Sequence, residues 1–190
     1  MKRCSTIDDV WQARDISPHL HGIHSPVLNV GVWFDAEDLA GTLRTYEAIT
    51  GQNPGLQNGL VMGPWMHGGW VRANMTNLGP LNFHENTSAF FRDQIAFPFF
   101  EHHLKNKPSL DLPPVLAYET GSNGWMRYAV WPPTNSAEKT LYLHASGKLS
   151  FVPPVDGEQA FDQYVSDPRH PVPQSEKVPT ELEEEFMFGD

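Results

Sequence analysis

Two hydrophobic patterns succeed each other in the first part of the chain. Residues 25–34 form a mostly apolar, β-branched run that opens with a serine and a proline, and such a run predicts a strand buried on both faces. Between residues 36 and 49 the apolar side chains recur at helical spacing, which predicts a helix. Residues 60–63 form a second short apolar run. This order predicts a strand–helix–strand unit with two parallel strands.

A further helix is predicted over residues 87–104. Asn86 or Thr87 can cap its start, five apolar side chains recur along one side, and Pro98 should kink it. The aromatic side chains of this stripe are best explained as core residues.

The pattern changes after residue 105, where prolines and polar residues accumulate. We therefore predict a domain boundary between residues 105 and 106. Short strand-like segments separated by turn residues follow, and they predict an antiparallel sandwich. These segments are residues 115–119, 125–131, 140–144, 149–152 and 161–165. The acidic residues 176–190 are typical of a solvated tail.

Composition narrows the classes of function. The chain has 190 residues, with 13 Lys and Arg against 23 Asp and Glu, a formal net charge of −10 and one cysteine. The acidic balance argues against nucleic-acid binding, and the single cysteine excludes a disulfide scaffold. No run approaches the roughly 18 apolar residues of a membrane span. The first residues lack the apolar core of a signal peptide, and the cellular location stays open.

The candidate chemistry lies at two strand ends. Asp35 follows the first predicted strand and His67 follows the second. Functional groups collect at the carboxyl ends of parallel strands, so we expect these two side chains on one edge, close enough to pair. An Asp that orients a His forms two thirds of a hydrolytic triad. The spacing of His19, His21 and His24 fits no standard zinc motif.

A nucleophile is harder to find. In α/β-hydrolases the order is nucleophile, acid, histidine, with the serine in a Gly-x-Ser-x-Gly turn. The serines before Asp35 are Ser5, Ser17 and Ser25, and none has these flanking glycines; no other serine in the chain has them either. The residues alone therefore leave two interpretations open, a catalytic pair and a structural pair.

Several motifs resemble those of the α-amino-acid ester hydrolases, within the wider family of X-Pro dipeptidyl-peptidase-like acylases and cocaine esterase. The matching stretches run in the same order along nearly the whole chain, and their Trp-rich motifs are specific. They include Trp33 to Leu39, Gly63 to Trp70, Phe97 to Lys105, Tyr118 to Trp125, Lys139 to Leu143, Gly147 to Phe151 and Tyr164 to Pro168.

The resemblance implies an α/β plus β fold. Residues 1–105 would be the C-terminal portion of an α/β-hydrolase domain, and residues 106–190 the first, incomplete portion of a jelly-roll-like β-sandwich. It implies that the chain is an internal fragment, because family members carry the nucleophilic serine, an oxyanion-hole tyrosine and a third cluster carboxylate before the matching region. We expect such a fragment to be marginally stable and inactive alone.

The resemblance also implies residue roles. Asp35 matches the triad acid and His67 the triad base, while Glu37 and Asp38 match a carboxylate cluster that binds the substrate's α-ammonium group. The complete serine hydrolase would cleave or transfer α-amino acyl groups, from esters and β-lactam amides, or X-Pro dipeptides, through an acyl-enzyme. We expect a small-molecule acyl substrate, no cofactor, no metal, and no nucleic-acid or membrane partner. A homo-oligomer stays open.

Three alternatives remain at this point. One is a related acylase or dipeptidyl-peptidase with another acyl preference. Another is a non-catalytic β-sandwich binding module with an aromatic face of Trp125, Tyr128, Trp131 and Tyr142, although these aromatics are explained more simply as sandwich core. The last is a divalent metal site formed by Asp35, Glu37, Asp38 and His67.

Overall fold

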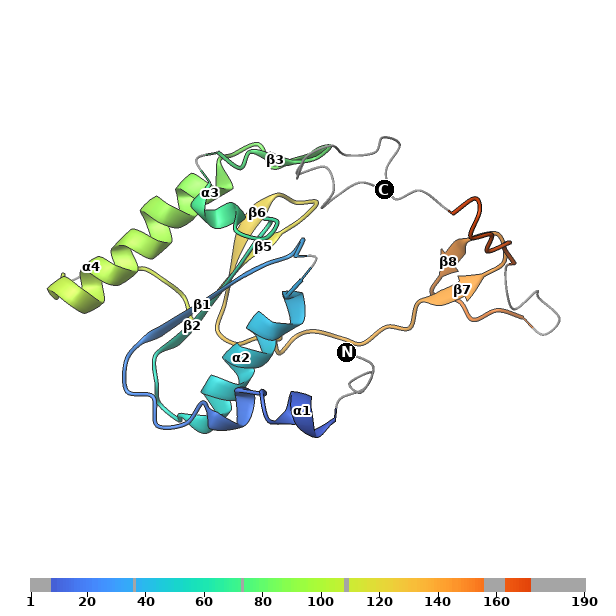
Figure 1. Cartoon of the computed structure of the whole chain (residues 1–190). Coiled ribbons are helices and arrows are strands. Elements are labelled where there is room, and N and C mark those ends of the chain that lie inside the picture. The colour runs from blue at the N-terminus through green and yellow to red at the C-terminus, as the bar shows by residue number, and fades with distance from the viewer. Residues whose placement is uncertain (1–7, 36, 73, 108–109, 156–162, 172–190) are drawn as a thin grey trace. The chain divides into compact units, whose positions relative to one another are not determined.

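The computed structural model describes residues 8–35, 37–72, 74–107, 110–155 and 163–171. The chain divides into two compact units, Met1–Trp131 and Pro132–Asp190. The first unit contains a sheet with helices on both faces, and the second contains a small hairpin (Figure 1). Within the described residues, no helix is long and apolar enough to cross a membrane.

The sheet of the first unit has the strand order β1-β2-β5-β6. Its strands are β1 (Val27–Val32), β2 (Asn58–Gly63), β5 (Val115–Glu119) and β6 (Gly124–Tyr128). β1, β2 and β5 are parallel, and β6 is antiparallel to β5. The predicted strand–helix–strand unit is confirmed, because β1 pairs with β2 from Val27 opposite Asn58 to Val32 opposite Gly63.

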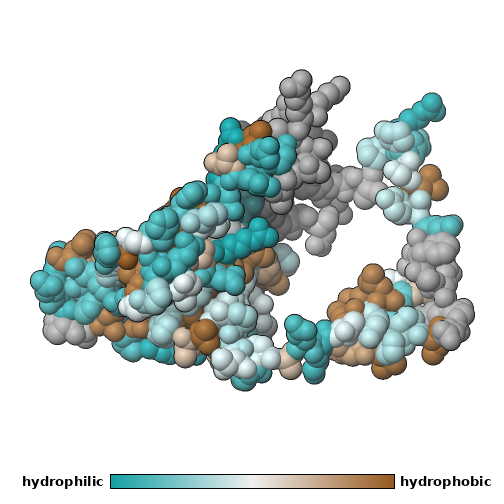
Figure 2. Space-filling model, turned by 90° about the horizontal axis from the view of Figure 1, so that it is seen from below, coloured by the Kyte–Doolittle hydropathy of each residue, from teal (hydrophilic) through white to brown (hydrophobic). Residues whose placement is uncertain are grey.

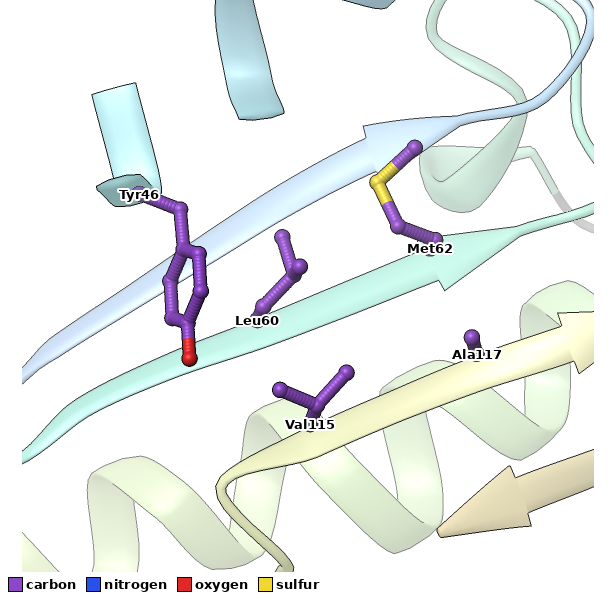
Figure 3. Close-up of a cluster of buried hydrophobic side chains, with 5 residues drawn as sticks. All are labelled: Tyr46, Leu60, Met62, Val115 and Ala117. Carbon is purple, nitrogen blue, oxygen red and sulfur yellow. The ribbon is translucent and has the colours of Figure 1, made fainter. Parts of the chain in front are cut away.

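Helix α2 (Leu39–Gln52) covers one face of the sheet (Figure 1). Its close approach needs Gly31 in β1, because a Cβ there would lie 2.6 Å from the Met62 sulfur and 2.8 Å from the Thr42 methyl. A core forms between helix and sheet, where apolar side chains leave water. Figure 3 shows its buried members, Tyr46, Leu60, Met62, Val115 and Ala117.

A long helical segment lies on the opposite side of the sheet from α2 (Figure 1). It consists of α3 (Thr87–Phe90), the π-helical η3 (Phe91–Ala96) and α4 (Phe97–Lys105). The predicted cap is confirmed, since the Asn86 side chain accepts the Ala89 N–H at 3.0 Å. The segment changes winding just before Pro98, which occupies the first turn of α4, where the missing N–H of proline leaves no helical bond unmade.

The division of the chain differs from the predicted boundary at residue 105. The segments predicted as the first two sandwich strands form β5 and β6, and β5 pairs with β2 from Val115 opposite Leu60. The first unit therefore continues to Trp131. The physical reason is burial: Val115 to Tyr118 are all buried, as in strands covered on both faces.

The second unit contains the antiparallel pair β7 (Tyr142–His144) and β8 (Lys148–Ser150). Its apolar side chains are largely exposed: Leu143 at 80%, Leu149 at 58% and Phe151 at 67%. Figure 2 shows apolar residues at the molecular surface among polar ones. Of the last predicted strand, residues 163–165 are described and lie outside any strand, while residues 161–162 and the acidic tail lie outside the described residues.

Short elements complete the first unit. They are α1 (Asp9–Gln12), η1 (Ser17–His19), η2 (Gly69–Val71), β3 (Asn77–Leu78) and β4 (Leu81–Asn82). Asn53, which caps the end of α2, holds the N-terminal segment in place: its side chain donates to the Leu20 carbonyl at 2.6 Å and accepts the Ile23 N–H at 2.9 Å.

Candidate active site

Two loops meet at the carboxyl ends of β1 and β2. Hydrogen bonding between the strands continues beyond the sheet, because Trp33 N–H donates to the Gly63 carbonyl at 2.9 Å and Phe34 N–H donates to the Trp65 carbonyl at 3.2 Å. These bonds fix the two loops to each other immediately before Asp35 and His67. The local fold therefore places the acid and the imidazole on the same edge of the sheet, as the parallel arrangement predicts.

Asp35 and His67 are paired. The His67 Nδ1 atom lies 3.2 Å from the Asp35 Oδ2 atom. The Asp35 side chain is 8% exposed, whereas the His67 side chain is 51% exposed. A buried carboxylate thus holds one nitrogen of an imidazole whose remaining surface is open to a reactant, which is the relation between the acid and the base in a hydrolytic triad.

The Asp35 carboxylate has further partners in its own loop. Its Oδ1 atom accepts the backbone N–H groups of Glu37 at 2.8 Å and Asp38 at 3.1 Å. Burial opposes ionisation of Asp35, but these two hydrogen bonds and the interaction with His67 together outweigh it, so the pKa of Asp35 is lowered from 3.8. The acid is therefore ionised at neutral pH and suited to stabilise an imidazolium.

Two indole rings anchor the loops from opposite sides. Trp33 donates its Nε1–H to the Tyr118 carbonyl of β5 at 2.7 Å. Trp65 is fully buried and donates to Thr87 Oγ1 at 2.8 Å, at the start of α3. Each loop is thus tied to an element other than its own strand, which limits the positions that Asp35 and His67 can adopt.

The two predicted substrate-binding acids lie near the pair. Glu37 and Asp38 are exposed and directly precede α2, whereas the helix predicted between residues 36 and 49 would include them. The reason is the Asp35 side chain, which takes both of their backbone N–H groups and keeps these residues in a turn. The Asp38 carboxylate lies over Gly41, where an added Cβ would come within 1.9 Å of its Oδ1 atom.

The described residues form neither of the two alternative sites, the metal site and the aromatic binding face. Among the described residues, no group of three or more His, Cys, Asp or Glu side chains is arranged to hold a metal ion. The aromatic residues of the alternative binding face are divided: Trp125 stacks on Phe90 at 5.1 Å, Tyr128 and Trp131 pack against the core beside α2, and Tyr142 belongs to β7 in the second unit.

Comparison with known proteins assigns this arrangement to a family. The model of the X-Pro dipeptidyl-peptidase (S15) family matches residues 1–69. The chain belongs to this family. The S15 family is a hydrolase family. The mixed α/β fold of this chain and its pairing of a buried Asp with an exposed His both agree with hydrolase chemistry.

Two solved structures resemble this S15 chain closely. An aminopeptidase from the marine sediment archaeon Thaumarchaeota archaeon is 40% identical, with a TM-score of 0.84. A selenomethionine-labelled α-amino acid ester hydrolase is 34% identical, with a TM-score of 0.85. Each comparison covers 97% of this chain and 31% of the other, so the chain spans about a third of either neighbour's length. No curated protein matches the sequence.

Sequence reasoning missed the residues that support the pair. Trp33 and Trp65 are visible in the sequence as tryptophans flanking Asp35 and His67, but their partners, Tyr118 and Thr87, lie far along the chain. Trp70 was likewise unassigned, and its ring lies 6.4 Å from the His67 ring at an interplanar angle of 63°. The concentration of tryptophans around both strand ends was the available signal.

Proposed function

We propose that Asp35 and His67 are the acid and the general base of a serine hydrolase. The complete enzyme would cleave or transfer α-amino acyl groups, from esters and β-lactam amides, or X-Pro dipeptides. The observation that carries the proposal is the 3.2 Å contact between a buried carboxylate and an exposed imidazole at adjacent strand ends. Membership of the S15 hydrolase family supports it.

The proposed reaction proceeds through an acyl-enzyme. His67 removes the proton from a serine hydroxyl, whose oxygen attacks the substrate's carbonyl carbon, and Asp35 stabilises the resulting imidazolium. His67 then gives the proton to the leaving alcohol or amine as the bond to the acyl carbon breaks. In the second half, His67 activates water, or another acyl acceptor, which releases the acyl group and restores the serine.

The serine is proposed to come from sequence outside these 190 residues. No serine of the chain lies in a Gly-x-Ser-x-Gly motif, and the two solved neighbours are about three times as long as the region they share with it. We therefore expect the isolated chain to be inactive, because the nucleophile and the oxyanion-stabilising donors contribute most of the rate enhancement.

Glu37 and Asp38 are proposed to bind the α-ammonium group of the acyl donor. Both side chains are exposed beside the acid–base pair, and two carboxylates attract a cationic amino group through charge-assisted hydrogen bonds. The structural neighbours support this choice of substrate, since one is named an aminopeptidase and the other an α-amino acid ester hydrolase.

A chimera tests the proposal. The matching third of the thaumarchaeal aminopeptidase would be replaced by this chain, and hydrolysis of α-amino acyl esters would be compared with hydrolysis of simple esters lacking the amino group. We expect activity that His67→Ala abolishes. The double substitution Glu37→Gln/Asp38→Asn should reduce kcat/KM for the α-amino esters by about tenfold or more and leave the simple esters nearly unchanged.

A matched control and two contrary outcomes make the test decisive. Glu47→Gln removes an exposed acid from the middle of α2, and it should leave both substrates unaffected. Full activity of the His67→Ala chimera would refute the assignment of the base. Equal losses on both ester classes in the double variant would refute the ammonium-binding role alone.

A further inference from the structure

A small pocket lies beside the carboxyl ends of β1 and β5. Its volume is about 260 Å³, and its lining residues are Trp33, Ala117, Tyr118, Glu119, Thr120, Tyr128 and Trp131. Neither Glu37 nor Asp38 lines it, so it is distinct from the acidic pair assigned above to the ammonium group. Four of the lining residues are aromatic, which is a high share for so small a space: Trp33, Tyr118, Tyr128 and Trp131.

Three of these rings, those of Trp33, Tyr128 and Trp131, are held at fixed orientations. The Trp33 ring is pinned by its hydrogen bond to the Tyr118 carbonyl, at 2.7 Å. The Trp131 ring lies 5.9 Å from Trp33 at an interplanar angle of 41°, and 5.8 Å from Tyr128 at 71°. All three rings pack partly against the buried core. The walls of the pocket are therefore formed before any ligand arrives, which lowers the entropic cost of binding.

The pocket is lined by one charged residue, Glu119 of β5. Ala117 and Glu119 share the α2 face of β5, because alternate residues of a strand point to the same side, and Ala117 belongs to the core on that face. Glu119 is the one charged residue among those lining the pocket, and no Lys, Arg or His joins them. Its carboxylate is exposed and accepts a hydrogen bond from Ser122 Oγ.

This combination has the chemistry of a cation site. The faces of aromatic rings carry negative potential, and several rings arranged around a small space recognise organic ammonium groups through cation–π attraction. A carboxylate at the rim adds direct charge complementarity. The volume is below the roughly 300 Å³ at which pockets for drug-sized ligands begin, so it suits one head group. We propose that Trp33, Tyr128, Trp131 and Glu119 bind the cationic head of a small organic ammonium compound.

Nuclear magnetic resonance of the full chain tests this proposal directly. The chain has six tryptophans, so its indole N–H signals form a small set that single substitutions assign. Choline chloride is the probe, and 3,3-dimethylbutan-1-ol is its uncharged counterpart of the same shape. We expect choline to shift the Trp33 and Trp131 signals saturably, and the alcohol to bind about tenfold more weakly or less, because it lacks the cation–π term.

Two variants and two controls locate the site. Trp131→Leu should weaken choline binding about tenfold, and Glu119→Gln, which alters an exposed side chain without removing core volume, should weaken it severalfold. Trp11→Phe removes a tryptophan that does not line the pocket, and it should leave the affinity unchanged. Glu37→Gln/Asp38→Asn should do the same, which separates this site from the acids in the proposed function.

Several results would overturn the inference. They are the absence of a saturable shift of Trp33 and Trp131 with choline, equal affinity for choline and the alcohol, and unchanged affinity in both pocket variants. Loss of choline binding in Glu37→Gln/Asp38→Asn, with Trp131→Leu unaffected, would place the cation at the acidic pair instead.

Discussion

Replacing Gly63 with alanine tests how tightly the His67 loop is packed. Gly63 is the last residue of β2. An added Cβ would lie 2.3, 2.3 and 2.5 Å from the Cε3, Cζ3 and Cη2 atoms of Trp65, whereas ordinary contacts begin at 3.4 Å. The ring or the strand would therefore have to move by about 1 Å.

The Trp65 ring has little freedom to move. It is fully buried, its Nε1–H is bonded to Thr87, and the rings of Phe91 and Trp125 lie 5.3 and 5.8 Å away. Overpacking of a close-packed core destabilises by about 1–3 kcal/mol, and we expect the upper half of this range because the obstructing atoms belong to an anchored ring.

Urea unfolding measured by far-ultraviolet circular dichroism would give the free-energy change. Gly51→Ala is the matched control: Gly51 lies near the end of α2 with no atom within 4 Å of an added Cβ, and alanine there should stabilise by about 0.5–1 kcal/mol. A Gly63→Ala stability within about 0.5 kcal/mol of the parent would refute the packing argument.

Three pH-dependent predictions follow from the ionisable groups. Asp35→Asn should lower the free energy of unfolding at pH 7 by about 1 kcal/mol. This deficit should shrink as the pH falls below 3.8. The reason is that the pKa of Asp35 is lowered from 3.8 in the folded chain, so its ionised carboxylate stabilises the fold above that pH and is lost on acidification. Glu101, paired with two lysines that lower its pKa, should likewise lose its stabilising effect on acidification, and Glu101→Gln should remove that part of the acid sensitivity. Burial and then His102 lower the pKa of His103, so stability should fall as the pH drops below 6.5, and His103→Phe should flatten this slope in thermal melts recorded from pH 8 to 5.

The sequence predicted the acid–base geometry because that geometry depends on local topology. A buried strand, a helix and a second buried strand in parallel bring Asp35 and His67 to one edge whatever else the chain does. The observed contact between them confirms that inference. The helix over residues 87–104 was also predictable, since its cap at Asn86 and its apolar stripe are both local features.

The membership of β5 and β6 could not be obtained in this way. The sequence of a short apolar strand does not indicate which sheet the strand joins. In addition, the proline-rich segment before Val115 resembled a linker between domains. The pairing with Leu60 is decided by long-range burial, which hydrophobic periodicity does not encode. The same limit hid the anchors of Trp33 and Trp65, whose acceptors lie 85 and 22 residues away.

These separations imply an order of assembly during synthesis. Asp35 and His67 are 32 residues apart and lie in one contiguous strand–helix–strand unit, so their loops can meet soon after residue 67 emerges. The Trp65 anchor needs Thr87, and the Trp33 anchor needs Tyr118. Because nearby segments close first, we expect the acid–base pair to form early on the ribosome as a loose contact. Two later hydrogen bonds would then fix the pair in position, first the bond from Trp65 to Thr87 of α3 and then the bond from Trp33 to Tyr118 of β5.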